Sequence, residues 1–125
     1  MRVLVIDDDK FVRTLLESEL RQENMEVLVV GDGEEGIKQV KEWKPDVIVL
    51  DLILPKKDGF EVLESIKGTP EGNHARIFAF STLTQEHDKA EAIALGARAY
   101  FHKGSDTVRR IIDAVHEDGG SPTLS

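Results

Sequence analysis

Short runs of β-branched and aliphatic residues alternate along this chain with longer stretches whose apolar residues recur at helical spacing. This alternation is typical of a parallel sheet with helices on both faces, because parallel strands need crossover connections and are buried on both sides. We expect strands at Val3–Ile6, Glu26–Val30, Val47–Leu50, Arg76–Phe80 and Arg98–His102. The sequence therefore predicts an α/β fold, a doubly wound parallel sheet of five strands.

Five helices are expected to connect and follow these strands. They lie at about Lys10–Gln22, Glu34–Trp43, Phe60–Lys67 and Gln85–Leu95, and the last contains Val108, Ile111, Ile112 and Val115 on one face. The apolar stripe of the first helix is expected to hold Phe11, Leu15, Leu16 and Leu20. The last helix is expected to be capped by Ser105 or Asp106. We place one domain at residues 1–118 and a flexible tail or the start of a linker at 119–125.

Composition removes several classes of function. The chain has no cysteine, which excludes thiol catalysis and thiolate metal sites. Its formal charge of -8 argues against binding nucleic acid or an anionic membrane directly, because phosphate groups are bound by clustered Lys and Arg. Its apolar runs are far shorter than the roughly 20 residues of a membrane span. We expect a cytoplasmic protein.

Polar side chains follow four of the predicted strands. They are Asp7, Asp8 and Asp9 after the first, Asp51 after the third, Ser81 and Thr82 after the fourth, and Lys103 after the fifth. Ligands of open α/β sheets bind at the carboxyl ends of the strands, so these groups are expected to share one edge. An isolated aspartate after a strand is commonly a helix cap, and we interpret Asp9 and Asp58 in that way.

Carboxylates that converge at a few ångströms repel one another by about 1 to 4 kcal/mol per pair, depending on the local dielectric. A divalent cation would relieve that repulsion. Oxygen ligands without thiolates or paired histidines favour Mg²⁺, which keeps waters that a phosphate can replace. A carboxylate beside Mg²⁺ can attack phosphorus, while an ammonium and a hydroxyl neutralise the phosphoryl oxygens. These residues therefore indicate Mg²⁺-dependent phosphoryl transfer to an aspartate.

Four segments together resemble the receiver domain of bacterial two-component response regulators, over about Arg2 to Val115. They are Val5–Asp9, Asp51–Gly59, Phe80–Ser81 and Tyr100–Lys103, in the same order and at matching spacing. The resemblance implies a flavodoxin-like sheet with strand order 2-1-3-4-5. It also implies a phosphorylation switch rather than an enzyme that turns over a substrate.

In that family, the residue matching Asp51 accepts a phosphoryl group from a phosphohistidine on a sensor histidine kinase or phosphotransfer protein. The acidic pair matching Asp7 and Asp8 holds Mg²⁺, with Asp8, Asp51 and the backbone carbonyl of Ile53 as direct ligands. The resemblance thus implies Asp51 as the phosphorylation site and Mg²⁺ as the cofactor.

The resemblance also implies how the phosphorylated state is recognised. Ser81 and Lys103 would contact the phosphoryl oxygens, and the ring at Tyr100 would change its exposure when Ser81 engages them. The surface of the fourth helix, the fifth strand and the last helix would then change and control a downstream effector protein or output domain.

Three features refine these expectations. Gly104 stands where the family usually has proline, often after a cis bond; because a cis bond before another residue costs about 2.5 to 4 kcal/mol, we predict a trans Lys103–Gly104 bond. Ile53 and Leu83, which by resemblance flank the phosphoryl site, should hinder attack by water and favour a long-lived acyl phosphate. By strand alternation, His102 should face away from the active lysine.

Three other interpretations are less well supported. Gly31–Gly36 matches the dinucleotide-binding pattern G-x-G-x-x-G, but it carries three carboxylates and follows the second strand, so a turn before an acidic helix start is preferred. A phosphatase of the haloacid-dehalogenase kind would need an acid where Ile53 stands. A binding module that has lost phosphorylation would lack a reacting group, and each is present.

Overall fold

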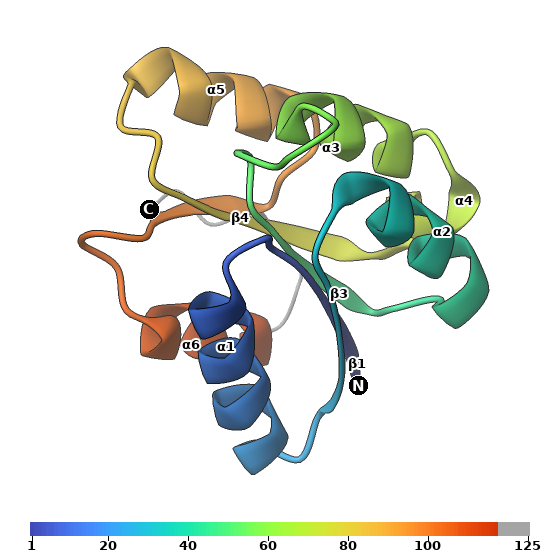
Figure 1. The fold of residues 1–125 in the computed structure, drawn as a ribbon, viewed down its shortest axis with the longest axis vertical. Coiled ribbons are helices and arrows are strands. Elements are labelled where there is room, and N and C mark those ends of the chain that lie inside the picture. The colour runs from blue at the N-terminus through green and yellow to red at the C-terminus, as the bar shows by residue number, and fades with distance from the viewer. Residues whose placement is uncertain (118–125) are drawn as a thin grey trace.

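A computed structural model describes residues 1–117, which form a parallel sheet between two layers of helices (Figure 1). The five strands are β1 (Arg2–Ile6), β2 (Glu26–Val30), β3 (Val47–Leu50), β4 (Arg76–Ser81) and β5 (Ala99–His102). All neighbouring strands are parallel, and their order is β2-β1-β3-β4-β5. The predicted fold class and strand order are confirmed.

Six helices lie within residues 1–117, where the sequence predicts five. They are α1 (Lys10–Gln22), α2 (Gly33–Trp43), α3 (Gly59–Lys67), α4 (Pro70–His74), α5 (Glu86–Ala94) and α6 (Val108–His116). The additional helix, α4, has five residues, too few for an apolar repeat to reveal it. Its start does carry a signal, because Thr69 accepts a hydrogen bond from the Gly72 N–H and Pro70 follows the cap. The predicted fourth and last helices correspond to α5 and α6.

Different helices cover the two faces of the sheet (Figure 1). On one face, α1 and α6 bury Leu16, Leu20, Ile111, Ile112 and Val115. On the other, α2, α3 and α5 bury Val40, Val62, Leu63, Ile66 and Ala92. Successive residues of β1, such as Val3 and Leu4, contribute to opposite faces. Because both faces are apolar, the strands present their polar side chains at their ends.

The buried face of α1 differs from the predicted stripe. Leu16 and Leu20 are fully buried, but Phe11 is 75% exposed and Leu15 is 38% exposed. Val12, Leu16 and Leu20 recur every four residues and pack on the sheet, whereas Phe11 and Leu15 lie about 100° further round the helix. The prediction is wrong for Phe11 and Leu15, whose side chains remain on the surface.

Two aspartates cap helices as predicted. Asp9 accepts a hydrogen bond from the Phe11 N–H at 2.9 Å, and Asp58 accepts one from the Phe60 N–H at 2.8 Å. Asp32 caps α2 in the same way, so the glycine-rich segment around it is a turn followed by an acidic helix start. This agrees with the interpretation preferred from the sequence.

The predicted cap of the last helix is wrong. Thr107 occupies the cap position of α6 and makes no side-chain cap hydrogen bond. Asp106 instead accepts a hydrogen bond from the His102 N–H at 2.8 Å and forms an ion pair with Arg110 at 2.8 Å. Its carboxylate therefore ties the end of β5 to α6.

Three expectations remain, on a membrane span, on one peptide bond and on the C-terminal tail. No helix within residues 1–117 is long and apolar enough to cross a membrane. The described residues contain no cis peptide bond, so the predicted trans bond between Lys103 and Gly104 is confirmed. The predicted tail at 119–125, and the domain boundary before it, lie outside the described residues.

Two adjacent leucines test the buried face of α1. Leu16→Ala removes a fully buried side chain and should lower the free energy of unfolding by about 2 to 5 kcal/mol, because a cavity adds to the lost transfer free energy. Leu15→Ala, on the exposed side, should cost under about 1 kcal/mol. Urea unfolding followed by circular dichroism measures both losses. Equal losses would contradict this orientation of the helix.

Candidate functional site

Three aspartate side chains converge where β1 and β3 end. Ile6 and Leu50 are register partners in the sheet, so the residues that follow them, Asp7 and Asp51, are neighbours. One carboxylate oxygen from each of Asp7, Asp8 and Asp51 lies within 4.8 Å of the others. Asp7 and Asp51 are buried, at 2% and 5% exposure, whereas Asp8 is exposed. The structure thus brings together the three carboxylates that the sequence places at one edge.

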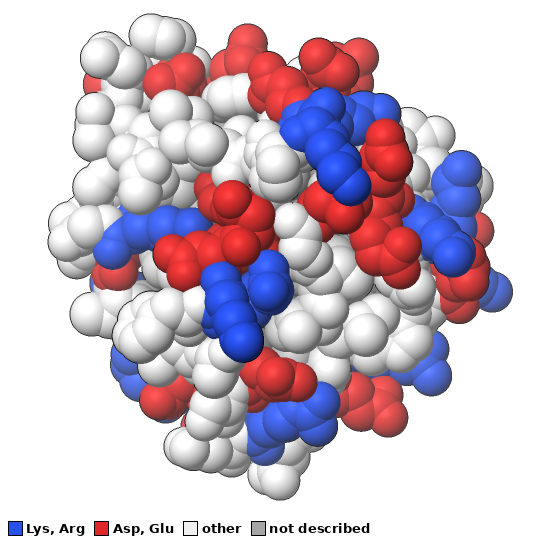
Figure 2. All heavy atoms as spheres, viewed as in Figure 1, with Lys and Arg blue, Asp and Glu red and all other residues white. Residues whose placement is uncertain are grey.

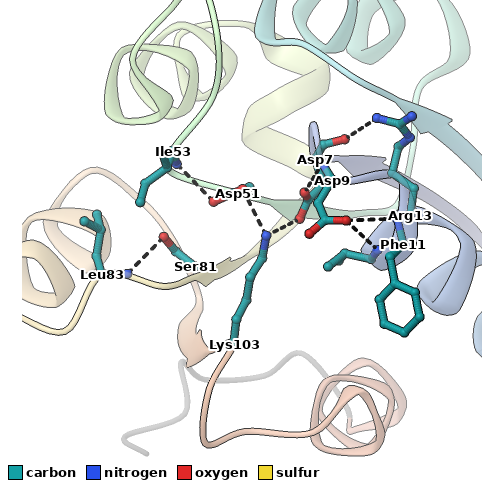
Figure 3. Close-up of polar contacts among 10 residues, drawn as sticks. Asp7, Asp9, Phe11, Arg13, Asp51, Ile53, Ser81, Leu83 and Lys103 are labelled. Atoms are coloured by element: carbon teal, nitrogen blue, oxygen red, sulfur yellow. Dashed lines mark hydrogen bonds and ion pairs between the residues drawn. The ribbon is translucent and has the colours of Figure 1, made fainter.

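Lys103 reaches this cluster from the end of β5 (Figure 3). Its Nζ lies 2.8 Å from Asp7 Oδ2 and 3.0 Å from Asp51 Oδ2. Its backbone N–H donates to the carbonyl of Ser81 at 2.8 Å, which fixes the start of the loop after β5. The Lys103 ammonium therefore bridges two buried carboxylates that come from different strands.

Burial governs the ionisation of the cluster. It raises the pKa of Asp7 and of Asp51 above the ordinary aspartate value, and the hydrogen bonds they accept and the charge of Lys103 offset this only in part. Burial alone would lower the pKa of Lys103, but its contacts with Asp7 and Asp51 raise that pKa overall. Lys103 therefore stays charged, and its single positive charge neutralises only part of the negative charge of the carboxylates around it.

Backbone donors hold the second oxygen of each buried carboxylate. Asp7 Oδ1 accepts from the Asp9 N–H at 2.9 Å, and Asp51 Oδ1 accepts from the Ile53 N–H at 3.0 Å (Figure 3). Arg13, which no sequence motif identifies, donates from Nη1 to the carbonyl of Asp7 at 2.9 Å. Its place six residues after Asp7, early in the predicted helix, is the signal that could have identified it. These contacts fix the acidic loop on the end of β1.

Ser81 ends β4 at the same edge and is fully buried. Its Oγ accepts a hydrogen bond from the Leu83 N–H at 3.4 Å (Figure 3). The neighbouring hydroxyl, that of Thr82, belongs to an exposed residue, because successive side chains at the end of a strand point to opposite sides. Of these two hydroxyls, Ser81 is the one placed to serve the site.

Tyr100 lies against the loop that follows Ser81. It is 8% exposed, and its hydroxyl donates a hydrogen bond to the carbonyl of Leu83. Burial raises the pKa of Tyr100 above that of an ordinary tyrosine. A movement of this loop would therefore act directly on the Tyr100 hydroxyl.

The donor set of the acidic cluster fits a hard divalent cation. It offers carboxylate oxygens of Asp7, Asp8 and Asp51, and oxygen ligands of this kind favour Mg²⁺, Ca²⁺ or Mn²⁺. Figure 2 shows acidic side chains gathered near the centre of one face of the molecule, with basic side chains beside them. A cation at the cluster would add the positive charge that Lys103 alone does not supply.

Comparisons with known proteins agree on one family. A family model of the response regulator receiver domain matches residues 3–116. The chain is 37% identical over 105 residues to the alkaline phosphatase synthesis transcriptional regulatory protein PhoP of Bacillus subtilis, a match that covers 82% of this chain and 42% of that protein. It is 32% identical over 102 residues to the chemotaxis protein CheY of Halobacterium salinarum, covering 82% of this chain and 83% of that protein.

A solved structure shares the fold. The chemotaxis protein CheY4 of Vibrio cholerae matches with a TM-score of 0.84, over 91% of this chain and 94% of that chain, at 24% identity. At that identity the likeness concerns the fold alone. The chain spans less than half the length of PhoP and most of the length of the Halobacterium CheY.

Asp51→Asn should stabilise the protein at neutral pH in the absence of divalent cations. Because burial raises the pKa of Asp51 in the folded protein, its ionisation lowers the free energy of unfolding at high pH. This loss disappears as the pH falls to 3.8, the pKa of an ordinary aspartate in the unfolded chain. The substitution should therefore raise the free energy of unfolding by about 1 kcal/mol or more, the scale of one carboxylate repulsion. Urea unfolding in EDTA at several pH values measures the gain.

The matched control is Asp113→Asn, at a side chain 64% exposed. It should change the free energy of unfolding by less than about 1 kcal/mol at any of these pH values. A loss of stability in Asp51→Asn, or a gain that does not shrink as the pH falls, would contradict the charge assignment.

Proposed function

The chain belongs to the response regulator receiver domain family, whose members are signalling switches controlled by phosphorylation, and on that premise we propose that Asp51 is its phosphoryl acceptor. The contact between Asp51 and Lys103 supports this most directly. A carboxylate at 5% exposure lies 3.0 Å from an ammonium, with Asp7 and Asp8 beside it. A nucleophilic carboxylate next to a fixed cation is what attack on phosphorus requires.

The phosphoryl donor would be a phosphohistidine on a sensor histidine kinase or a phosphotransfer protein. An oxygen of Asp51 would form the new P–O bond as the P–N bond breaks, and the histidine would leave as a neutral imidazole after gaining a proton. We propose that Asp7, Asp8, Asp51 and the Ile53 carbonyl hold Mg²⁺, which when bound would neutralise charge on the transferred group.

Lys103 and Ser81 would supply two further contacts. Lys103 Nζ already lies at an oxygen of Asp51, so it can bind an oxygen of a phosphoryl group attached there. Ser81 Oγ accepts the Leu83 N–H, so its own O–H can donate to another phosphoryl oxygen. Bonds of this kind are charge-assisted and roughly twice as strong as neutral ones. Phosphorylation would therefore draw both side chains toward Asp51.

We propose Tyr100 and the surface of α5, β5 and α6 as the part that a downstream effector protein or output domain recognises. The Tyr100 hydroxyl is bound to Leu83, so a shift of Ser81 would change its surroundings. Converting a 1% active population to 99% needs about 5.5 kcal/mol. Two or three charge-assisted bonds, at about 1.5 to 3 kcal/mol each, can supply that. This switching would take place in the cytoplasm.

Apolar side chains near the acidic cluster are the surface on which we propose that the phosphoryl donor docks. Phe11 is 75% exposed, Ile53 is 48% exposed and Leu15 is 38% exposed. Phe11 and Leu15 lie on successive turns of α1, and Ile53 follows Asp51 by two residues. Exposed apolar patches mark interaction surfaces, and we propose that these three side chains contribute to one.

A phosphatase that turns over small phosphoesters is the weaker alternative. Ile53 stands where such an enzyme would need an acid for the leaving group, and it is apolar and partly exposed. Leu83 is also apolar and lies in the loop after Ser81. We propose that both hinder water, so the acyl phosphate on Asp51 persists.

Incubation with acetyl phosphate and Mg²⁺, followed by intact mass measurement, tests the proposed function. We expect one phosphoryl group per wild-type chain and none on Asp51→Asn, because the amide is not a nucleophile. The control Asp58→Asn, at a helix cap where asparagine serves as well as aspartate, should be phosphorylated like the wild type. Release of phosphate without a lasting adduct would favour the phosphatase. If the wild type showed no adduct and released no phosphate, both functions would be refuted.

A further inference from the structure

His102 ends β5, and its ring turns away from the acidic cluster toward the loop after β4, as strand alternation predicts. Its Nε2 lies 3.2 Å from the carbonyl oxygen of Thr82. Its Nδ1 lies 3.1 Å from the backbone nitrogen of Gly104 and 3.3 Å from Ser105 Oγ. The ring therefore touches both loops that leave this edge of the sheet, the one after β4 and the one after β5.

These partners define the protonation of the ring. A carbonyl oxygen can only accept, so Nε2 must carry a hydrogen to bond Thr82. A backbone N–H can only donate, so Nδ1 must be unprotonated to accept from Gly104. The Ser105 hydroxyl can donate to the same atom. The neutral Nε2–H tautomer satisfies all three contacts, whereas the other neutral tautomer would lose those with the Thr82 carbonyl and the Gly104 N–H and keep only that with the Ser105 hydroxyl, which can also accept.

Gly104 is fitted to this contact. A Cβ at this position would lie 2.8 Å from His102 Cε1 and 3.2 Å from Nδ1, so a side chain would displace the ring. Proline, which would also lack the N–H that Nδ1 accepts, cannot make the contact. The backbone at Gly104 has no positive φ. Glycine is therefore needed here for space and for its N–H, rather than for an unusual conformation.

The loop after β4 is held from β5 at two successive carbonyls. His102 bonds the carbonyl of Thr82, and Tyr100 bonds that of Leu83. The N–H of Leu83 in turn donates to Ser81 Oγ at 3.4 Å. The position of the Ser81 hydroxyl therefore depends on how β5 holds the two residues that follow it.

We propose that His102 is a positioning residue of the switch. As the Nε2–H tautomer it joins the loop that follows Ser81 to the loop that follows Lys103, so that the two groups meant to contact the phosphoryl group move together. The inference rests on the proposed function of Asp51 and deepens it. His102 makes no contact with the phosphoryl group itself.

The tautomer can be observed without any phosphorylation. Imidazole ¹⁵N–¹H correlation spectra of the full chain at neutral pH, with the His102 signals assigned by their loss in His102→Leu, report which nitrogen carries the hydrogen. We expect a protonated Nε2 and a bare Nδ1. A protonated Nδ1, or the averaged signals of a mixture of tautomers, would overturn the proposed positioning role of His102.

The coupling of His102 to Gly104 is tested by a double-mutant cycle on the rate of phosphoryl uptake from acetyl phosphate. His102→Leu should slow uptake by roughly three- to tenfold, the effect of losing one or two hydrogen bonds. Gly104→Ala should slow it similarly by displacing the ring, and the double variant should match His102→Leu within about twofold. The exposed His74, on α4, provides the control His74→Leu, which should react like the wild type.

The outcomes separate this inference from the proposed function. Independent, multiplying effects of His102→Leu and Gly104→Ala, or no effect of His102→Leu, would overturn the positioning role while Asp51 remained the acceptor. Absence of uptake by the wild-type chain would overturn the proposed function, and the positioning role with it, even if the tautomer were as expected.

Discussion

The contact of Lys103 with both Asp7 and Asp51 is the interaction on which this site depends. Lys103 is the partner that cannot be lost without cost, because its removal would leave two buried carboxylates uncompensated in a poorly solvated place, whereas removal of Asp51 would leave the ammonium paired with Asp7. Here the ammonium lies 2.8 Å and 3.0 Å from two carboxylates of nearly zero exposure, and Asp8 adds a third negative charge close by. Lys103 thus holds the carboxylates together at this edge of the sheet, but the site still carries more negative than positive charge.

The sheet makes this arrangement possible and also predictable. Apolar runs buried on both faces can carry polar groups only at their ends, so the sequence identified the strands and the acidic edge together. The register of β1 and β3 then places Asp7 beside Asp51. In contrast, the sequence predicts a buried Phe11, which the structure shows to be exposed. Two neighbouring positions of the helix are both apolar, so the pattern fits two orientations of the helix that differ by one residue, or about 100°. The five-residue helix α4 was missed because it is too short for a periodic signal.

The contacts that link the site to its surroundings depend on tertiary positions that no spacing rule gives. His102 was expected to face away from the active lysine, and it does, but its meeting with Thr82 and Gly104 follows from where two loops lie in space. The glycine at 104 stands where the family usually has proline. The structure shows that its N–H and its missing side chain accommodate an imidazole instead. Sequence and structure together therefore connect an unusual residue to a defined contact.

The central claim is that the cluster of Asp7, Asp8 and Asp51 lacks positive charge that a divalent cation can supply, with Lys103 already competing for the same oxygens. Calorimetric titration of Mg²⁺ at pH 8 into the wild type and into Lys103→Met, with the exposed Lys38→Met on α2 as control, tests this most directly. Removing a charge about 3 Å from two ligand oxygens should tighten Mg²⁺ binding at least about fivefold. The control should bind like the wild type. Unchanged or weaker binding by Lys103→Met would contradict the account.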